Sequence, residues 1–211
     1  MEYTFFANKK KMEDKKEFFL KNAGELYMRF GIRAVTMDDV AAEFGISKKT
    51  LYQYFKDKED LVHQVIEYYL ENPIFNLNKE GLGNAIDRII ALRNHVSQII
   101  KHYNNHLEYD LKKTYPMLYK KVYDFKRQRI YSDTVRNISD GMKSGLFRKD
   151  LNPDFIAKIQ VGRMLYTFNP DNQIFDAHEL ATIQLFDEVM DYHMHAICTE
   201  EGKAYYQKQL R

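Results

Sequence analysis

The sequence has 211 residues, of which only 9 are glycine and 4 are proline, and its formal net charge is +2. So few turn-forming residues beside 29% charged residues favour an all-α protein over a doubly wound α/β or an all-β protein. A hydrophobic content of 45% excludes disorder as the main state, and no apolar stretch approaches the roughly 18–20 residues of a membrane span. The small net charge by itself argues mildly against nucleic acid as a partner.

The chain is expected to be cytoplasmic. Its single cysteine, Cys198, cannot form an internal disulfide, which fits a reducing compartment. Near the start, the short apolar stretch 3–7 precedes Lys9, Lys10 and Lys11, which is the wrong order for a secretory signal.

The first predicted helix covers residues 14–30, because apolar residues recur there every three or four positions. Gly31 follows it as a left-handed cap. Thr36 and Asp39 have the spacing of a capping box, in which each residue satisfies a backbone N–H of the other. They predict a second, short helix over residues 37–44.

Gly45 is expected to end this short helix in a left-handed conformation, and Ser47 then caps a third helix that reaches residue 55. Two short helices joined by a three-residue turn that contains glycine predict a helix-turn-helix, which places its second helix in the DNA major groove. The positive charge is concentrated here, since residues 45–58 contain four lysines and one aspartate. This local charge outweighs the argument from the net charge.

The third helix has an apolar face and a polar face, because successive residues are about 100° apart. Leu51 and Phe55 share the face that must pack inward. Lys49, Thr50 and Gln53 point away from it and can reach base edges, lysine at guanine and glutamine at adenine. The flanks, where phosphates would pass, carry Lys48, Tyr52 and Tyr54.

Several local features occur together between residues 19 and 61. They are the helix end Phe30-Gly31, the Thr36 cap, the turn Gly45-Ile46-Ser47, and the signature Leu51-Tyr52-x-Tyr54-Phe55-x-x-Lys58-Glu59-x-Leu61. This stretch resembles the DNA-binding domain of TetR-type transcriptional regulators. The resemblance implies phosphate contacts from Thr36, Tyr52 and Lys58, and base or backbone contacts from Lys48, Lys49, Thr50 and Gln53.

The rest of the chain is expected to be helical as well. Asp57 caps a fourth helix, and apolar periodicity together with proline positions predicts helices over 58–71, 82–103, 105–113, 116–143, 153–168 and 177–198. The predicted architecture is therefore about nine helices. They are divided into a DNA-binding domain, residues 1–60, and a larger ligand-binding and dimerisation domain, residues 61–211.

In the family that the sequence resembles, the last two helices usually pair with their copies in a second subunit. Apolar residues occupy most of the circumference of the segment 180–197, which is more than one core face requires. A helix buried within the monomer is the alternative explanation. The predicted dimer interface consists of Phe155, Ile159, Ile183, Phe186, Met190, Met194 and Ile197.

The 16 tyrosines and 14 phenylalanines are the feature most suggestive of a ligand cavity, although aromatic stripes are more often plain core. The predicted pocket residues are His102, Tyr103, His106, Tyr109, Tyr123, Arg127, Tyr166 and Phe168. Such a pocket would suit a planar or lipophilic molecule with a polar end. His102 and His106 are spaced like metal ligands but lack a clear third ligand, so no metal and no cofactor are expected.

No glycine-rich phosphate loop, nucleophile elbow or convincing acid–base pair occurs, so catalysis has no support in the sequence. We expect a homodimeric regulator, most simply a repressor, that binds palindromic double-stranded DNA and is released by a small-molecule effector. One alternative is a helical ligand-binding or scaffold protein that no longer reads DNA. A more distant one is an all-α enzyme that uses His102 or Cys198.

Overall fold

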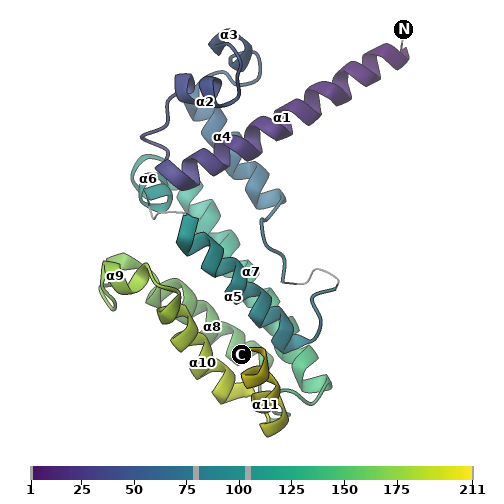
Figure 1. Cartoon of the computed structure of the whole chain (residues 1–211), viewed down its shortest axis with the longest axis vertical. Coiled ribbons are helices and arrows are strands. Elements are labelled where there is room, and N and C mark those ends of the chain that lie inside the picture. Colours follow the sequence, from purple (N-terminus) through teal and green to yellow (C-terminus); the bar gives the residue numbers. More distant parts are fainter. Residues whose placement is uncertain (1, 78–80, 103–105, 211) are drawn as a thin grey trace. The chain divides into compact units, whose positions relative to one another are not determined.

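The computed structural model describes residues 2–77, 81–102 and 106–210 (Figure 1). Over these ranges the regular structure is helical apart from one isolated bridge between Phe147 and Cys198. The predicted all-α class is therefore confirmed.

The described ranges contain eleven α-helices and one short 3₁₀ helix, η1. Their bounds are α1 (Glu2–Phe30), α2 (Met37–Glu43), α3 (Lys48–Leu51), α4 (Lys58–Glu71), α5 (Ala85–His102), α6 (His106–Thr114), α7 (Pro116–Lys143), α8 (Pro153–Thr167), η1 (Pro170–Asn172), α9 (Ala177–Leu180), α10 (Ile183–Ile197) and α11 (Glu200–Gln209).

The chain divides into two compact units. Unit 1 comprises α1–α4, α6 and the first part of α7, up to Tyr123. Unit 2 comprises the segment from Phe75 through most of α5, the rest of α7 from Asp124, and α8–α11. Each unit has its own cluster of buried apolar side chains.

The three predicted N-caps and the two predicted glycine caps around the helix-turn-helix are confirmed. Thr36, Ser47 and Asp57 are N-caps whose side chains accept a hydrogen bond from the backbone N–H three residues on. Gly31 and Gly45 have φ angles of +82° and +62°, the left-handed conformation that a side chain disfavours. Local sequence chemistry therefore sets these boundaries.

Two predicted boundaries in the N-terminal region are wrong. Helix α1 begins at Glu2 rather than at residue 14, because no glycine or proline interrupts the chain between them. Helix α3 ends at Leu51, well before residue 55. The N–H groups of Gln53 and Tyr54 bond to carbonyls three residues back rather than four, so the chain tightens into turns.

The predicted helix over 177–198 is in fact two helices, α9 and α10. Thr182 breaks it, because its hydroxyl accepts a hydrogen bond from the N–H of Leu185 and so starts α10. Helix α11 was not predicted, and Thr199 caps it in the same way. Helix α5 starts at Ala85 rather than at residue 82, since Asn84 accepts hydrogen bonds from the first N–H groups of the helix.

The core of unit 1 fixes the helix-turn-helix to α1 and α4, which pack on each other. Leu51 and Phe55 are completely or almost completely buried, as predicted for the inward face of α3. Tyr27 of α1 and Leu61 of α4 are equally buried in the same cluster. Burying a side chain of this size stabilises the fold by about 1.5–3 kcal/mol, so α3 is held by packing rather than by its own four residues.

In unit 2 the buried cluster joins residues of α5, α7, α10 and α11. Phe147 is fully buried against Gly141, where an added Cβ would overlap its ring. Cys198 is also buried, and burial raises the pKa of its thiol to about 11. The thiol is therefore protonated at neutral pH, which makes it a poor nucleophile.

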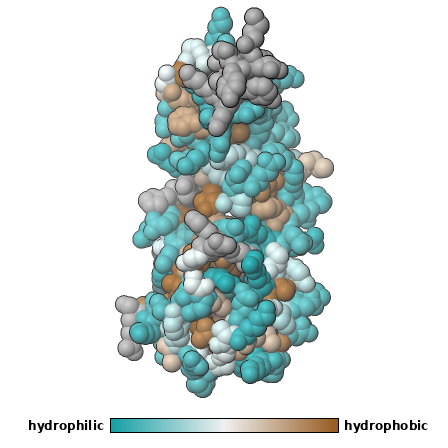
Figure 2. Space-filling view, turned by 90° about the vertical axis from the view of Figure 1, so that its right-hand side faces the viewer, coloured by the Kyte–Doolittle hydropathy of each residue, from teal (hydrophilic) through white to brown (hydrophobic). Residues whose placement is uncertain are grey.

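Among the described residues, no helix is long and apolar enough to cross a membrane. The face shown in Figure 2 agrees with this, since hydrophilic residues cover most of it and hydrophobic ones appear in small patches.

Candidate nucleic-acid interface

The start of α2 is held by a reciprocal capping box between Thr36 and Asp39. The N–H and the hydroxyl of Thr36 donate to Oδ2 of Asp39 at 2.8 Å and 2.6 Å, and the N–H of Asp39 donates to the Thr36 hydroxyl at 3.2 Å. These hydrogen bonds lower the pKa of the Asp39 carboxyl. The Thr36 hydroxyl already donates its proton to Asp39. The phosphate contact that the resemblance implies therefore needs the hydroxyl to turn away from Asp39, or it must come from a backbone N–H instead.

The turn between α2 and α3 is closed by backbone hydrogen bonds. The N–H of Ile46 donates to the carbonyl of Ala41 at 3.0 Å, and the N–H of Gly45 donates to that of Ala42 at 3.1 Å. This double closure is the glycine-ended helix stop that the sequence predicts. Helices α2 and α3 consequently contact each other and form a helix-turn-helix at the end of unit 1 (Figure 1).

Two of the residues predicted to read bases are exposed on α3 and the turn that follows it. Lys49 and Gln53 both lie on the surface, opposite the buried Leu51. Neither side chain makes a hydrogen bond or ion pair with another residue of the described ranges. Thr50 is half-buried instead, with its hydroxyl 2.9 Å from that of Ser47. Of the three residues predicted to read bases, Lys49 and Gln53 are therefore the exposed ones.

The flanking residues differ from one another. Tyr52 is exposed, whereas Tyr54 is half-buried, and its ring lies edge-on to that of Phe19 with 5.0 Å between the ring centroids. Lys58 is also partly buried. Its ammonium group donates to the carbonyl of Arg33 at 3.4 Å, and burial lowers its pKa. Tyr54 and Lys58 therefore also support the structure around the interface.

Lys48, the first residue of α3, is paired with a residue that the sequence analysis did not single out. Its Nζ lies 2.9 Å from Oδ2 of Asp38, the second residue of α2. The carboxylate raises the pKa of Lys48. The sequence could not predict this pair, because it depends on how α2 and α3 cross.

Asp110 of α6 is a second residue that the sequence analysis missed. Its carboxylate is buried and accepts a hydrogen bond of 2.8 Å from the N–H of Arg33, in the loop before α2. A signal for it did exist, since Asp110 falls between Leu107 and Leu111, on the apolar face of α6. A charged residue at such a position indicates a specific partner.

The residues predicted to line a ligand pocket are divided between the two units. His106, Tyr109 and Tyr123 belong to unit 1, and Arg127, Tyr166 and Phe168 belong to unit 2. Tyr103 and the side chain of His102 lie outside the described residues.

Most of these side chains are open to solvent. His106, Tyr109, Tyr123, Arg127 and Tyr166 are exposed. Phe168 is the half-buried one, with its ring 6.0 Å from that of Phe186. Within the described ranges, no group of three or more histidine, cysteine or acidic side chains is arranged to hold a metal ion.

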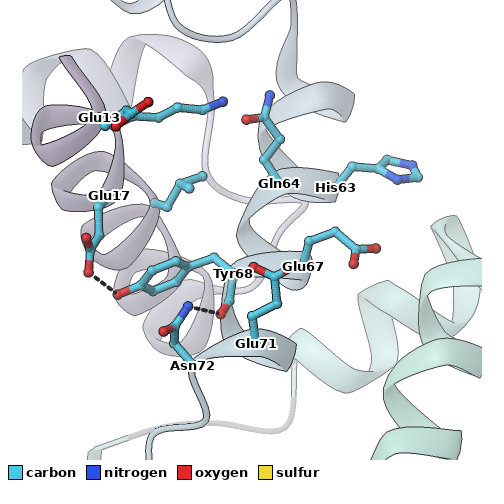
Figure 3. Close-up of a pocket in the computed structure, with 10 residues that line it drawn as sticks. Glu13, Glu17, His63, Gln64, Glu67, Tyr68, Glu71 and Asn72 are labelled. Carbon is cyan, nitrogen blue, oxygen red and sulfur yellow. Dashed lines mark hydrogen bonds between the residues drawn. The ribbon is translucent and has the colours of Figure 1, made fainter. Parts of the chain in front are cut away.

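An open cavity of about 440 Å³ lies elsewhere in unit 1, between α1 and α4 (Figure 3). None of the predicted pocket residues lines it. Four glutamates do, and the hydroxyl of Tyr68 donates to Glu17 at 3.2 Å. The lining residues are Glu13, Lys16, Glu17, Leu20, His63, Gln64, Glu67, Tyr68, Glu71 and Asn72. Such an acidic surface repels phosphate, so it does not suit binding of the DNA backbone.

The residues predicted for the dimer interface fall into two groups. The first group is buried in the core of unit 2 and consists of Phe186, Met190, Met194 and Ile197. For these four residues the alternative explanation, a helix buried within the monomer, holds. Ile183 is half-buried against the same core.

Phe155 and Ile159 lie on the surface of α8, 57% and 54% exposed. They share one face of the helix with Gly162, which has open space around it, and with Tyr166, which is 59% exposed. An apolar surface is therefore left uncovered on α8.

A buried helix-turn-helix core beneath an exposed polar face defines a DNA-binding protein of the helix-turn-helix class. A family model described as "Bacterial regulatory proteins, tetR family" matches residues 19–65. Residues 19–65 are therefore similar to the tetR family of bacterial regulatory proteins, and the curated relatives of the chain are transcriptional regulators as well.

Two curated relatives come from Bacillus subtilis (strain 168), and both are described as uncharacterized HTH-type transcriptional regulators. YerO is 33% identical over 82 residues, which cover 37% of this chain and only 28% of YerO. YhgD is 26% identical over 157 residues, or 70% of this chain and 79% of YhgD.

A solved transcriptional regulator from Cytophaga hutchinsonii shares the fold. Its TM-score is 0.66, at 23% identity over 88% of this chain and 99% of that one.

Proposed function

We propose that the chain is a repressor that binds a palindromic operator as a homodimer and is released when a small molecule binds to it. The observation that carries the DNA-binding part is the exposed pair Lys49 and Gln53 above the buried Leu51. A lysine can donate to guanine O6 and N7, and a glutamine amide can bond both to N6 and N7 of adenine. Because one such helix reads few bases, two copies related by a two-fold axis supply the specificity.

The second copy is the proposed occupant of the apolar face on α8. Phe155, Ile159 and Tyr166 are large, exposed and aligned, whereas single exposed apolar residues elsewhere need no explanation. The exposed face of α10 carries two carboxylates, Glu188 and Asp191. A dimer through α8 and α10 would bury the apolar face and bring these carboxylates to a second subunit.

Arg163 of α8 supports this arrangement. Its guanidinium donates to the side-chain oxygen of Gln160, but its Nε is buried without a hydrogen-bond partner. Burial lowers the pKa of Arg163. The neighbouring His193 cannot balance this charge, because its protonated form is itself positive, and burial and Arg163 lower its pKa to about 3 and keep it neutral. A carboxylate from a second subunit would compensate this charge, which is otherwise costly to bury.

The proposed effector acts by shifting a population. A ligand that binds better when the two DNA-reading helices are held apart must lower the affinity for DNA by the same coupling free energy, typically about 1–3 kcal/mol. We retain residues 61–211 as the effector and dimerisation region and residues 1–60 as the DNA-binding region, since all proposed DNA contacts precede residue 60. The cytoplasm remains the proposed location of the protein.

The test is to replace Gln53 with alanine and compare binding to a selected operator and to a mixed-sequence duplex. If the amide holds an adenine, Gln53→Ala should cost about 1–3 kcal/mol on the operator and almost nothing on the other duplex. Gln207→Ala is the matched control, because Gln207 is an exposed glutamine of α11 in unit 2. Titration by gel shift at several salt concentrations measures both affinities.

Two results would contradict the proposal. Equal losses on both duplexes would show that Gln53 does not read a base. Wild-type protein without salt-dependent DNA binding would favour a helical ligand-binding or scaffold protein that no longer reads DNA.

A further inference from the structure

An acidic residue lies at the proposed DNA-reading surface, where phosphates would oppose it. Asp38 is highly exposed, with 69% of its side chain accessible, and its carboxylate contacts the ammonium of Lys48 at 2.9 Å. Half of the Lys48 side chain is accessible too. A carboxylate in this place weakens binding to DNA unless it has another role.

Asp38 makes no capping hydrogen bond with α2, and its contribution to the helix is limited to the favourable position of its charge in the first turn. The N-cap of α2 is completed by Thr36 and Asp39, whose three hydrogen bonds do not involve the Asp38 carboxylate. Within the described ranges its side chain has Lys48 as its partner. Exposed ion pairs of this kind are weak, so DNA with suitably placed acceptors can displace the carboxylate.

We propose that Asp38 is a specificity-determining residue that withholds Lys48 from arbitrary DNA. On mixed-sequence DNA the pair stays closed, so Lys48 neutralises no phosphate and Asp38 repels the backbone. On the operator, contacts from Lys49 and Gln53 bring an acceptor of the DNA within reach of Lys48, and the pair opens. Asp38 thus lowers non-specific affinity more than operator affinity, an inference that rests on the proposed DNA-binding function.

The experiment measures binding of the full-length protein to a mixed-sequence duplex and to a selected operator, as a function of salt. Asp38→Asn keeps the side-chain shape but releases Lys48. We expect non-specific affinity to rise about three- to tenfold and the slope of log K against log salt to steepen by about 0.9, the value for one added phosphate contact. Operator affinity should change less, so the ratio of specific to non-specific binding should fall.

Two further variants separate release of Lys48 from a simple change of charge. Glu43→Gln is the matched control, because Glu43 is exposed on the same helix and pairs with no described lysine. The second is Asp38→Asn combined with Lys48→Met, in which there is no lysine to release. The gain in slope should be absent from both, and thermal unfolding should show that all variants are folded.

The proposal is overturned if Asp38→Asn behaves like Glu43→Gln, or if its gain persists without Lys48. It is also overturned if Asp38→Asn weakens operator binding alone, since Asp38 would then read a base directly. These comparisons apply when the wild-type protein binds DNA in a salt-dependent way. Absence of that binding would instead contradict the proposed function itself.

Discussion

Replacing Ile159 with aspartate is expected to split the proposed homodimer. Ile159 is at the middle of the exposed apolar face of α8, with Phe155 one turn before it and Tyr166 two turns after it. A carboxylate there would be buried against apolar side chains of a second copy, which costs several kcal/mol at both related positions of the interface. Sedimentation or light scattering should show the mass falling from twice 25.2 kDa to 25.2 kDa.

Loss of the dimer should also remove most of the affinity for the operator. Two linked DNA-reading helices bind more tightly than one by a factor of about 100 or more, so Ile159→Asp should lose at least that much. Met117→Asp is the control, because Met117 of α7 is 78% exposed and belongs to unit 1. A wild-type monomer, or an Ile159→Asp protein that keeps the double mass, would refute an interface on α8.

Gly31→Ala should destabilise the protein far more than Gly45→Ala, although both glycines have positive φ angles. Left-handed backbone costs an alanine about 1–2 kcal/mol at either position. At Gly31 a Cβ would also lie 2.9 Å from Oδ2 of Asp110 and 3.0 Å from Cβ of His106, whereas at Gly45 nothing lies within 4 Å. We therefore expect losses of about 3 kcal/mol at Gly31 and about 1 kcal/mol at Gly45.

Urea unfolding of the two variants measures this difference directly. The crowding at Gly31 displaces the Asp110 carboxylate, and with it the hydrogen bond to the N–H of Arg33. Equal losses for the two variants would mean that α6 does not pack against the loop before α2 as described.

The helix-turn-helix could be predicted closely because its signals are local. Thr36, Ser47 and Gly45 act through hydrogen bonds and backbone angles that span three or four residues. Helix ends with weaker local signals were not predicted. Thr182 divides one expected helix into two, because it caps α10, but a threonine within an apolar pattern does not by itself indicate a cap.

Apolar periodicity shows how much of a helix is hydrophobic but not what covers each side. For this reason the sequence assigned Phe186 and Met194 to a dimer interface, whereas both pack inside unit 2. The same limit applies to charges. Lys48 could be predicted as a flank residue of α3, but its pairing with Asp38 requires the crossing of two helices, and the bond between Asp110 and Arg33 spans 77 residues.

In the proposed regulator, two copies of this chain read a two-fold symmetric DNA site through α3. Selection of bound fragments from a genomic pool by the full-length protein, followed by sequencing, tests it most directly. We predict enrichment of an inverted repeat whose half-sites are centred about 10 base pairs, or a multiple of that, apart. Enrichment of sites without two-fold symmetry, or of no sites at all, would contradict it.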